Sequence, residues 1–208
     1  MFRLDWVGAL LLSFVAGYSP ACFAAPTSLT ICIHDDAVLN PKDLATTASE
    51  LRGILRSAGA EPGIFIDTKK GSGTRCRPAP GVTRVFDFRI IPGSARYVRD
   101  VRHPPLGHST VDGRGGLYAV IFLEPIRGRA SAAGVPVTLL LAYVAAHEFG
   151  HLLLGANAHS RQGIMKAAWE PTDLIAVSQR SLRFDDEQRR RIAERWQSPS
   201  QTELTQIR

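Results

Sequence analysis

The chain has 208 residues, 45% of them apolar and 21% charged, which fits one globular domain able to bury a core. This balance excludes a disordered or fibrous protein. The net charge of +6 could suggest a nucleic-acid partner, but the basic residues are scattered, and the one dense cluster, Arg189 to Arg191, follows acidic residues on an expected helix. A solvated helix face explains that cluster, so we expect no nucleic-acid partner.

Residues 1–24 are typical of a signal peptide. A positively charged start precedes an almost wholly apolar stretch from Trp6 to Tyr18, and Cys22 and Ala24 have the small-residue spacing that signal peptidase recognises. The stretch is well short of the roughly 20 residues that span a bilayer, so we expect no stable membrane insertion after cleavage. Cleavage after Ala24 would give an exported domain of residues 25–208, periplasmic or secreted.

Cleavage would leave two cysteines, Cys32 and Cys76. An oxidising compartment permits one disulfide bond between them. Two unpaired thiols, one of them in a core strand, are the alternative, because bridging depends on the distance between the two Cα atoms.

The first half of this domain predicts three strands and an amphipathic helix. Strands are expected at residues 28–34, 63–67 and 82–91, which are apolar and rich in β-forming residues. After the first strand, apolar residues recur at helical spacing from Asn40-Pro41 to Ser57-Ala58-Gly59, which predicts one helix.

The second half predicts a long loop, a fourth strand and two helices. Residues 94–116 have little apolar periodicity and are long for a connection, which makes them a candidate functional loop. A strand is expected at residues 117–123, an apolar helix at residues 135–154 and a last helix from about Asp185 to Trp196, with no helix around Trp169-Glu170-Pro171. The order β-α-β-β-β-α, followed by an irregular segment and a helix, predicts a single α+β domain with helices against one sheet.

The apolar helix carries the motif H-E-x-x-H at residues 147–151. Its histidines, four residues apart, share one helix face, so both imidazoles can bind one ion. Catalytic zinc takes three protein ligands and a water, and Glu148 could reach that water as general base. The alternative is a buried helix whose histidines are satisfied by hydrogen bonds, which so apolar a helix accommodates poorly.

The run from His147 to Met165 resembles the metzincin sequence H-E-x-x-H-x-x-G-x-x-H followed by a Met-turn. The resemblance implies that Gly155 ends the helix, that His147, His151 and His159 bind Zn²⁺, and that Gly163-Ile164-Met165 forms the Met-turn. It also implies a zincin-like, metzincin-type domain with a mixed sheet and a short C-terminal subdomain that ends in a helix. The pattern HExGHLLLGxxxHSxxGIM is similar to that of small exported bacterial proteins.

The spacing departs from the metzincin pattern after the second histidine. Gly155 comes one residue late and His159 two residues late, so Leu154 and Asn157 occupy the usual positions. Because a loop beyond a helix end tolerates insertion, His159 can still reach the metal. The chief rival as third ligand is Glu170, since other zincins take a downstream glutamate, and Asp173 is a weaker one.

The resemblance implies a zinc-dependent endopeptidase that acts on a peptide or protein substrate. The strand at residues 117–123 would take the place of the metzincin edge strand, to which an extended substrate adds. His103 and His108 have no partner at ligand spacing, so we expect surface or locally hydrogen-bonded residues there, although both lie in the long loop and could border a cleft. The alternative is an exported zinc-binding or interaction protein without general proteolysis, and a third possibility is a structural domain with an incidental motif. No tyrosine follows Met165 to act as a transition-state donor, which weakens the claim of proteolysis. Oligomeric state and cleavage preference are left open by the sequence.

Overall fold

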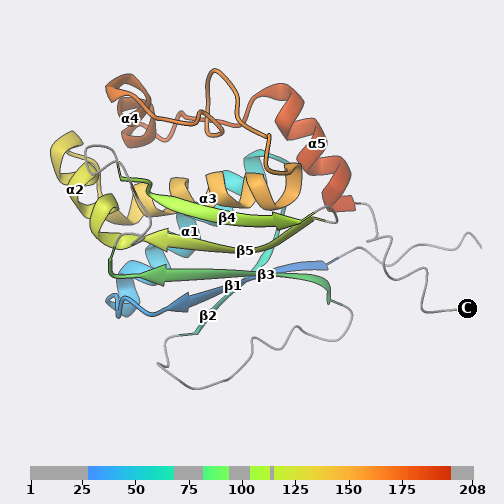
Figure 1. Ribbon diagram of the computed structural model, residues 1–208, viewed down its shortest axis with the longest axis horizontal. Helices are drawn as coiled ribbons and strands as arrows, with labels where there is room; N and C mark the ends of the chain where they lie inside the picture. The colour runs from blue at the N-terminus through green and yellow to red at the C-terminus, as the bar shows by residue number, and fades with distance from the viewer. Residues whose placement is uncertain (1–27, 68–81, 94–103, 113–114, 198–208) are drawn as a thin grey trace, which may run out of the picture.

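The structure is a computed structural model that describes residues 28–67, 82–93, 104–112 and 115–197 (Figure 1). The expected signal peptide and Cys76 lie outside these residues, so export and the Cys32–Cys76 disulfide stay predictions. The described elements are β1 (Ser28–Asp35), α1 (Pro41–Ser57), β2 (Gly63–Asp67), β3 (Val82–Ile91), β4 (Gly107–Asp112), β5 (Gly115–Phe122), α2 (Leu123–Ala133), α3 (Val137–Leu154), α4 (Pro171–Ser178) and α5 (Asp186–Gln197).

The strands form one mixed sheet in the order β2-β1-β3-β5-β4. β1, β2, β3 and β5 run parallel to one another, whereas β4 pairs antiparallel with β5. α1 joins β1 to β2, because parallel neighbours need a crossover connection. Together with the helices, this sheet gives the α+β domain that the sequence predicted.

α1 covers part of the sheet with the apolar face that its spacing predicted. The side chain of Asn40 accepts a hydrogen bond from the backbone N–H of Lys42 and so caps the first turn. On the face of α1 that packs against the sheet and α3, the side chains of Leu44, Leu51 and Leu55 are fully buried. Each buried leucine contributes roughly 1.5–3 kcal/mol of burial free energy, which fixes α1 on this face.

α3 is the core helix of the domain. It contacts β4 and β5 as well as α1, α2, α4 and α5, so it has neighbours on nearly every side (Figure 1). By length and composition it could cross a membrane, with a mean hydropathy of 1.5, but 83% of it is buried inside the fold. A helix enclosed in this way is apolar all round, which explains why the few polar residues on it stand out.

Two segments expected to be irregular are ordered elements. Residues 107–112 of the expected loop form β4, a strand whose polar sequence suits the edge of a sheet. α4 begins at Pro171, where no helix was expected, because proline is well suited to a first helical position. A capping box between Glu170 and Asp173 completes that helix start.

α2 was also missing from the sequence-based prediction. It follows β5 directly and ends at Gly134, whose positive φ of 65° is the left-handed conformation that glycine adopts most easily. Pro125 lies in the first turn, where no intrahelical N–H bond is lost.

The expected edge strand is an inner strand. β5, the counterpart of the strand expected at residues 117–123, is paired with β3 on one side and with β4 on the other. The edge beside α3 is therefore β4, because residues 107–112 fold back along β5 in antiparallel register.

Candidate metal centre

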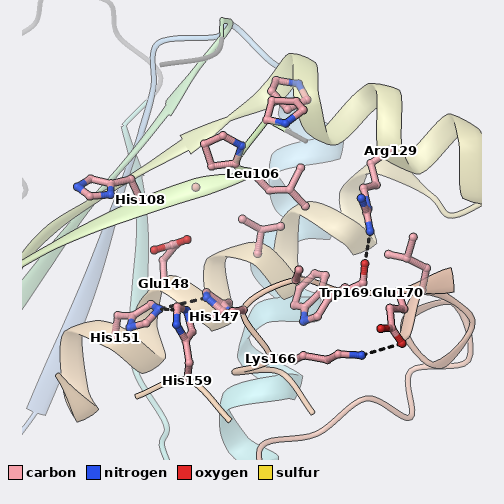
Figure 2. A pocket seen from close by; sticks show the side chains of 18 of the residues that line it. Leu106, His108, Arg129, His147, Glu148, His151, His159, Lys166, Trp169 and Glu170 are labelled. Carbon is pink, nitrogen blue, oxygen red and sulfur yellow. Dashed lines mark hydrogen bonds and ion pairs between the residues drawn. The ribbon is translucent and has the colours of Figure 1, made fainter. Parts of the chain in front are cut away.

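Three histidines converge at the C-terminal half of α3. His147 and His151 project from the same helix face, and His159 comes from the segment that follows the helix (Figure 2). The Nε2 atom of His151 lies 3.2 Å from Nε2 of His147 and 3.1 Å from Nε2 of His159. All three ligand atoms lie within 4.8 Å of one another, so this group could hold a metal ion.

The hydrogen bonds of the rings are those of a metal-binding set. Nδ1 of His147 lies 2.7 Å from the carbonyl oxygen of Ile164, and Nδ1 of His151 lies 3.3 Å from that of Gly155. A carbonyl only accepts, so each Nδ1 carries the proton and each Nε2 of a neutral ring presents a lone pair. Lone pairs facing each other at 3.2 Å repel unless a cation lies between them.

Burial favours the neutral form of His147 and His151. Burial lowers the pKa of His147 to about 4, although the hydrogen bond to the carbonyl of Ile164 acts in the opposite direction and raises it. Burial also lowers the pKa of His151. Neutral imidazole is the form that binds a metal. In tetrahedral coordination at about 2.0–2.1 Å, ligand nitrogens lie roughly 3.3 Å apart, close to the separations of the Nε2 atoms here. The residues therefore fit a tetrahedral ion such as zinc.

The segment after α3 delivers His159 in spite of its late position. Gly155 ends the helix with a φ of 102°, and its N–H donates to the carbonyl of His151. Further on, the N–H of Ser160 donates to the carbonyl of Met165, which closes the turn that follows His159. A longer helix end and a closed turn thus compensate for the changed spacing.

Met165, the methionine of the expected Met-turn, packs against α3 at Gly150. Its side chain is fully buried, and a Cβ added at Gly150 would overlap its sulfur atom. Gly150 lies between His147 and His151 in the motif, so the absence of a side chain there lets Met165 approach α3. Gly163 has a φ of 77°, which glycine adopts without strain.

Glu148 is held against β4. Its side chain is 5% exposed, and Ser109 Oγ lies 2.5 Å from Oε2 and donates to it. A Cβ added at Gly107 would lie 2.6 Å from Oε1, so β4 passes close to the carboxylate. Burial raises the pKa of Glu148 to about 7, and the bond from Ser109 opposes this shift.

A cavity of about 1350 Å³ opens beside the three histidines and Glu148. Its walls come from the start of β4, from α2 and α3, and from the segment between Lys166 and Ile175 (Figure 2). His108 of β4 lines it, as expected for a residue that borders a cleft, whereas His103 lies outside the described residues. The metal-binding group is thus open to a ligand of substantial size.

The rival ligands are engaged elsewhere. Nζ of Lys166 lies 3.1 Å from Oε2 of Glu170 and 2.8 Å from Oδ2 of Asp173. Within the described part of the chain, only the three histidines form a group that could hold a metal ion. The structure therefore brings together the residues that the motif predicted and keeps both carboxylates apart from them.

Four residues of the site were not predicted: Gly107, Ser109, Arg129 and Trp169. The ring of Trp169 meets that of His147 edge-on, with centroids 6.0 Å apart, and its Nε1 donates to the carbonyl of Ile164. That carbonyl also accepts from His147, so Trp169 helps to fix the acceptor that orients the first ligand. Gly107-His108-Ser109 shows no alternation of apolar and polar residues, so no pattern in the sequence indicated a strand beside Glu148.

The chain is similar to a solved metalloproteinase structure, the crystal structure of metalloproteinase-II from Bacteroides fragilis. The TM-score is 0.49 and the sequence identity 15%; the alignment covers 83% of this chain and 54% of that one, so the chain spans about half the length of that structure. No protein-family model matches the chain, and no curated protein matches it. The function therefore has to be inferred from the chain's own residues.

Proposed function

We propose that this chain is a zinc-dependent peptidase in which His147, His151 and His159 hold the metal and Glu148 is the general base. One observation carries the proposal: three Nε2 atoms converge beside a buried carboxylate, at the side of a cavity bounded by an edge strand. Zinc in such a site supplies Lewis acidity, which polarises a carbonyl and makes water a nucleophile at neutral pH.

Glu148 supplies the proton transfers. Its carboxylate would take a proton from the attacking water and pass it to the leaving amine. The hydroxyl of Ser109 holds the carboxylate in one orientation during these transfers. His147 and His151 are held in the neutral form because burial lowers the pKa of both rings.

The proposed substrate is a peptide segment in extended conformation. β4 is paired with β5 on one side, and among the described strands none pairs with its other edge. An extended peptide could add to that edge through backbone hydrogen bonds, with side chains entering the cavity beside the metal. The signal-peptide pattern of residues 1–24 supports action in the periplasm or outside the cell.

An exported zinc-binding protein without general proteolysis is the second candidate. It is favoured by the absence of a tyrosine after Met165, since the site would lack the transition-state donor that some metzincins place there. The two candidates agree on bound metal and differ on turnover.

The test begins with the zinc content of the purified chain, a His159→Ala variant and an Asn157→Ala control. Asn157 is exposed in the same loop, so its loss changes the loop without removing a ligand. We expect about one zinc per parent and control chain and much less in the His159 variant. No zinc in the parent chain would refute both candidates.

Hydrolysis of a mixed peptide library by the zinc-loaded chain then separates the candidates. Cleavage that disappears in a Glu148→Gln variant with full zinc content supports the peptidase. A zinc-loaded chain that cleaves no peptide supports the binding protein. Cleavage that survives in Glu148→Gln would refute the role assigned to Glu148.

A further inference from the structure

The cavity beside the histidines continues into a part that we call the Arg129 chamber. Figure 2 shows this chamber on the far side of the cavity from the three histidines, with Arg129 reaching down from α2 toward Trp169. Most of its wall is apolar. It is lined by Leu106, Pro125, Arg129, Val144, Trp169 and Leu174.

Arg129 is the exception in this wall, and its charge is not neutralised there. Its Nη2 donates to the carbonyl of Trp169, but its Nε is buried and has no hydrogen-bond partner within the described chain. No ion pair joins Arg129 to any carboxylate of the described residues. A guanidinium in an apolar wall that leaves a buried N–H without an acceptor costs folding free energy, unless an anion accepts that hydrogen bond and balances the charge.

The nearby carboxylates already form ion pairs with other residues. Glu124 of the same helix pairs with Arg127 at 2.8 Å, while Glu170 and Asp173 both pair with Lys166. The partner of Arg129 is therefore to be sought in what enters the cavity. Carboxylate is the chemical group that fits best, because the planar guanidinium offers parallel N–H donors to its two oxygens.

The position of the chamber relative to β4 determines which part of a bound substrate reaches the chamber. Antiparallel pairing is the more stable arrangement, and a peptide paired so with β4 runs from the Asp112 end toward the Gly107 end. Residues that follow the scissile bond then extend toward Leu106, at the start of β4, and so toward the chamber.

We propose that Arg129 binds a carboxylate on the C-terminal side of the scissile bond, so that the protein selects acidic peptides. The carboxylate is either the side chain of an aspartate or glutamate or the C-terminal carboxylate of a short peptide. The proposal rests on the proposed peptidase function. Arg129 acts here as a specificity-determining residue and takes no part in proton transfer.

The experiment compares matched peptides on the zinc-loaded full chain. One pair differs by glutamate or glutamine directly after the cleaved bond, and a second pair differs by a free or an amidated C-terminus. We expect kcat/KM to be about tenfold to hundredfold higher for the acidic member of one pair, the size of a charge-assisted hydrogen bond. Whichever pair responds identifies the source of the carboxylate.

Variants on α2 assign that preference to Arg129. Arg129→Gln should lose the preference, so that kcat/KM becomes equal for the acidic and the neutral member of each pair, and Arg129→Lys, which keeps the charge without the planar donors, should retain part of the preference. Arg127→Gln is the matched control, because it removes the same charge from an exposed position of the same helix. A parent chain that cleaves both members of each pair equally would overturn the proposal and leave the peptidase intact.

Binding gives a readout that does not need turnover. Labelled peptides of both pairs are titrated into zinc-loaded Glu148→Gln protein, in which the chamber is unchanged, and fluorescence anisotropy reports the dissociation constants. Tighter binding of the acidic peptides that Arg129→Gln abolishes supports the carboxylate-binding role of Arg129, and a parent chain that binds them in this way but cleaves nothing refutes only the peptidase function. Equal binding of acidic and neutral peptides, or no binding of either, overturns it.

Discussion

Gly107 of β4 lies close to the candidate general base, and a Gly107→Ala variant tests whether β4 positions Glu148. An added Cβ would lie 2.6 Å from Oε1 and 3.0 Å from both Cδ and Cγ of Glu148. Ordinary contact begins at 3.4 Å, so the carboxylate would have to move by about 0.8 Å, the difference between 3.4 and 2.6 Å. All three near contacts of the added methyl group are atoms of Glu148, and no histidine is among them.

The expected result is a loss of rate without a loss of metal. Misplacing a catalytic group by about 1 Å can cost roughly 100-fold in rate, so we expect kcat to fall by about 30- to 100-fold. Zinc content should equal that of the parent chain, because the three ligands keep their positions. The backbone at Gly107 is free of the left-handed conformation, so alanine adds no backbone strain there.

Three measurements on purified protein check this prediction: zinc content, thermal unfolding and peptide hydrolysis. Gly53→Ala is the matched control, since Gly53 is exposed on α1 and an added Cβ there meets no atom within 4 Å. The control should keep its kcat and gain up to about 1 kcal/mol of helix stability. A Gly107→Ala chain with parental kcat would refute the reasoning that β4 positions the base.

Three further predictions follow from the same contacts. Ser109→Ala removes the hydrogen bond that lowers the pKa of Glu148, so kcat should fall about tenfold and the acidic limb of the pH–rate profile should move to higher pH; an unchanged profile would contradict this. In chelator-treated protein, burial raises the pKa of Glu148 from 4.5 to about 7, so the folded chain holds a proton that the unfolded chain releases, and stability is lost as the pH rises through this window. Denaturant unfolding of Glu148→Gln should therefore show a gain of roughly 1–3 kcal/mol over the parent at pH 8 that vanishes below pH 4.5. Gly150→Ala pushes a methyl group into the sulfur of Met165 and should cost about 1–3 kcal/mol of unfolding free energy, which a parental melting temperature would disprove.

Local patterns were sufficient for most of the fold. Apolar, β-rich stretches placed β1, β2, β3 and β5, and helical spacing placed α1, α3 and α5, because those elements bury one or more faces in the core. β4, α2 and α4 escaped prediction for other reasons. β4 lies at the edge and needs few apolar residues, while α2 and α4 carry prolines in their first turns that read as helix breakers.

The candidate site likewise has residues that a local pattern predicted and residues that no local pattern predicted. His147, Glu148 and His151 lie within one helix turn, so their spacing alone predicted that they share a face. Ser109 and Arg129 reach the site from other elements, 39 and 40 residues away from the groups that they bond, and no local pattern reports such contacts. Their roles follow from the way the sheet edge and α2 pack around α3.

The enclosure of α3 has a consequence for how fast the metal exchanges. Two of the proposed ligands, His147 and His151, belong to a helix surrounded on nearly every side, whose amide hydrogens should exchange with solvent only when the whole domain unfolds. His159 is exposed and sits on a loop, so it is the ligand that can swing away while the other two stay in place. Metal should therefore enter and leave through movement of His159. The rate of zinc transfer to a chelator should then follow the dynamics of residues 155–159, and the metal-free helix should keep its protection from hydrogen exchange.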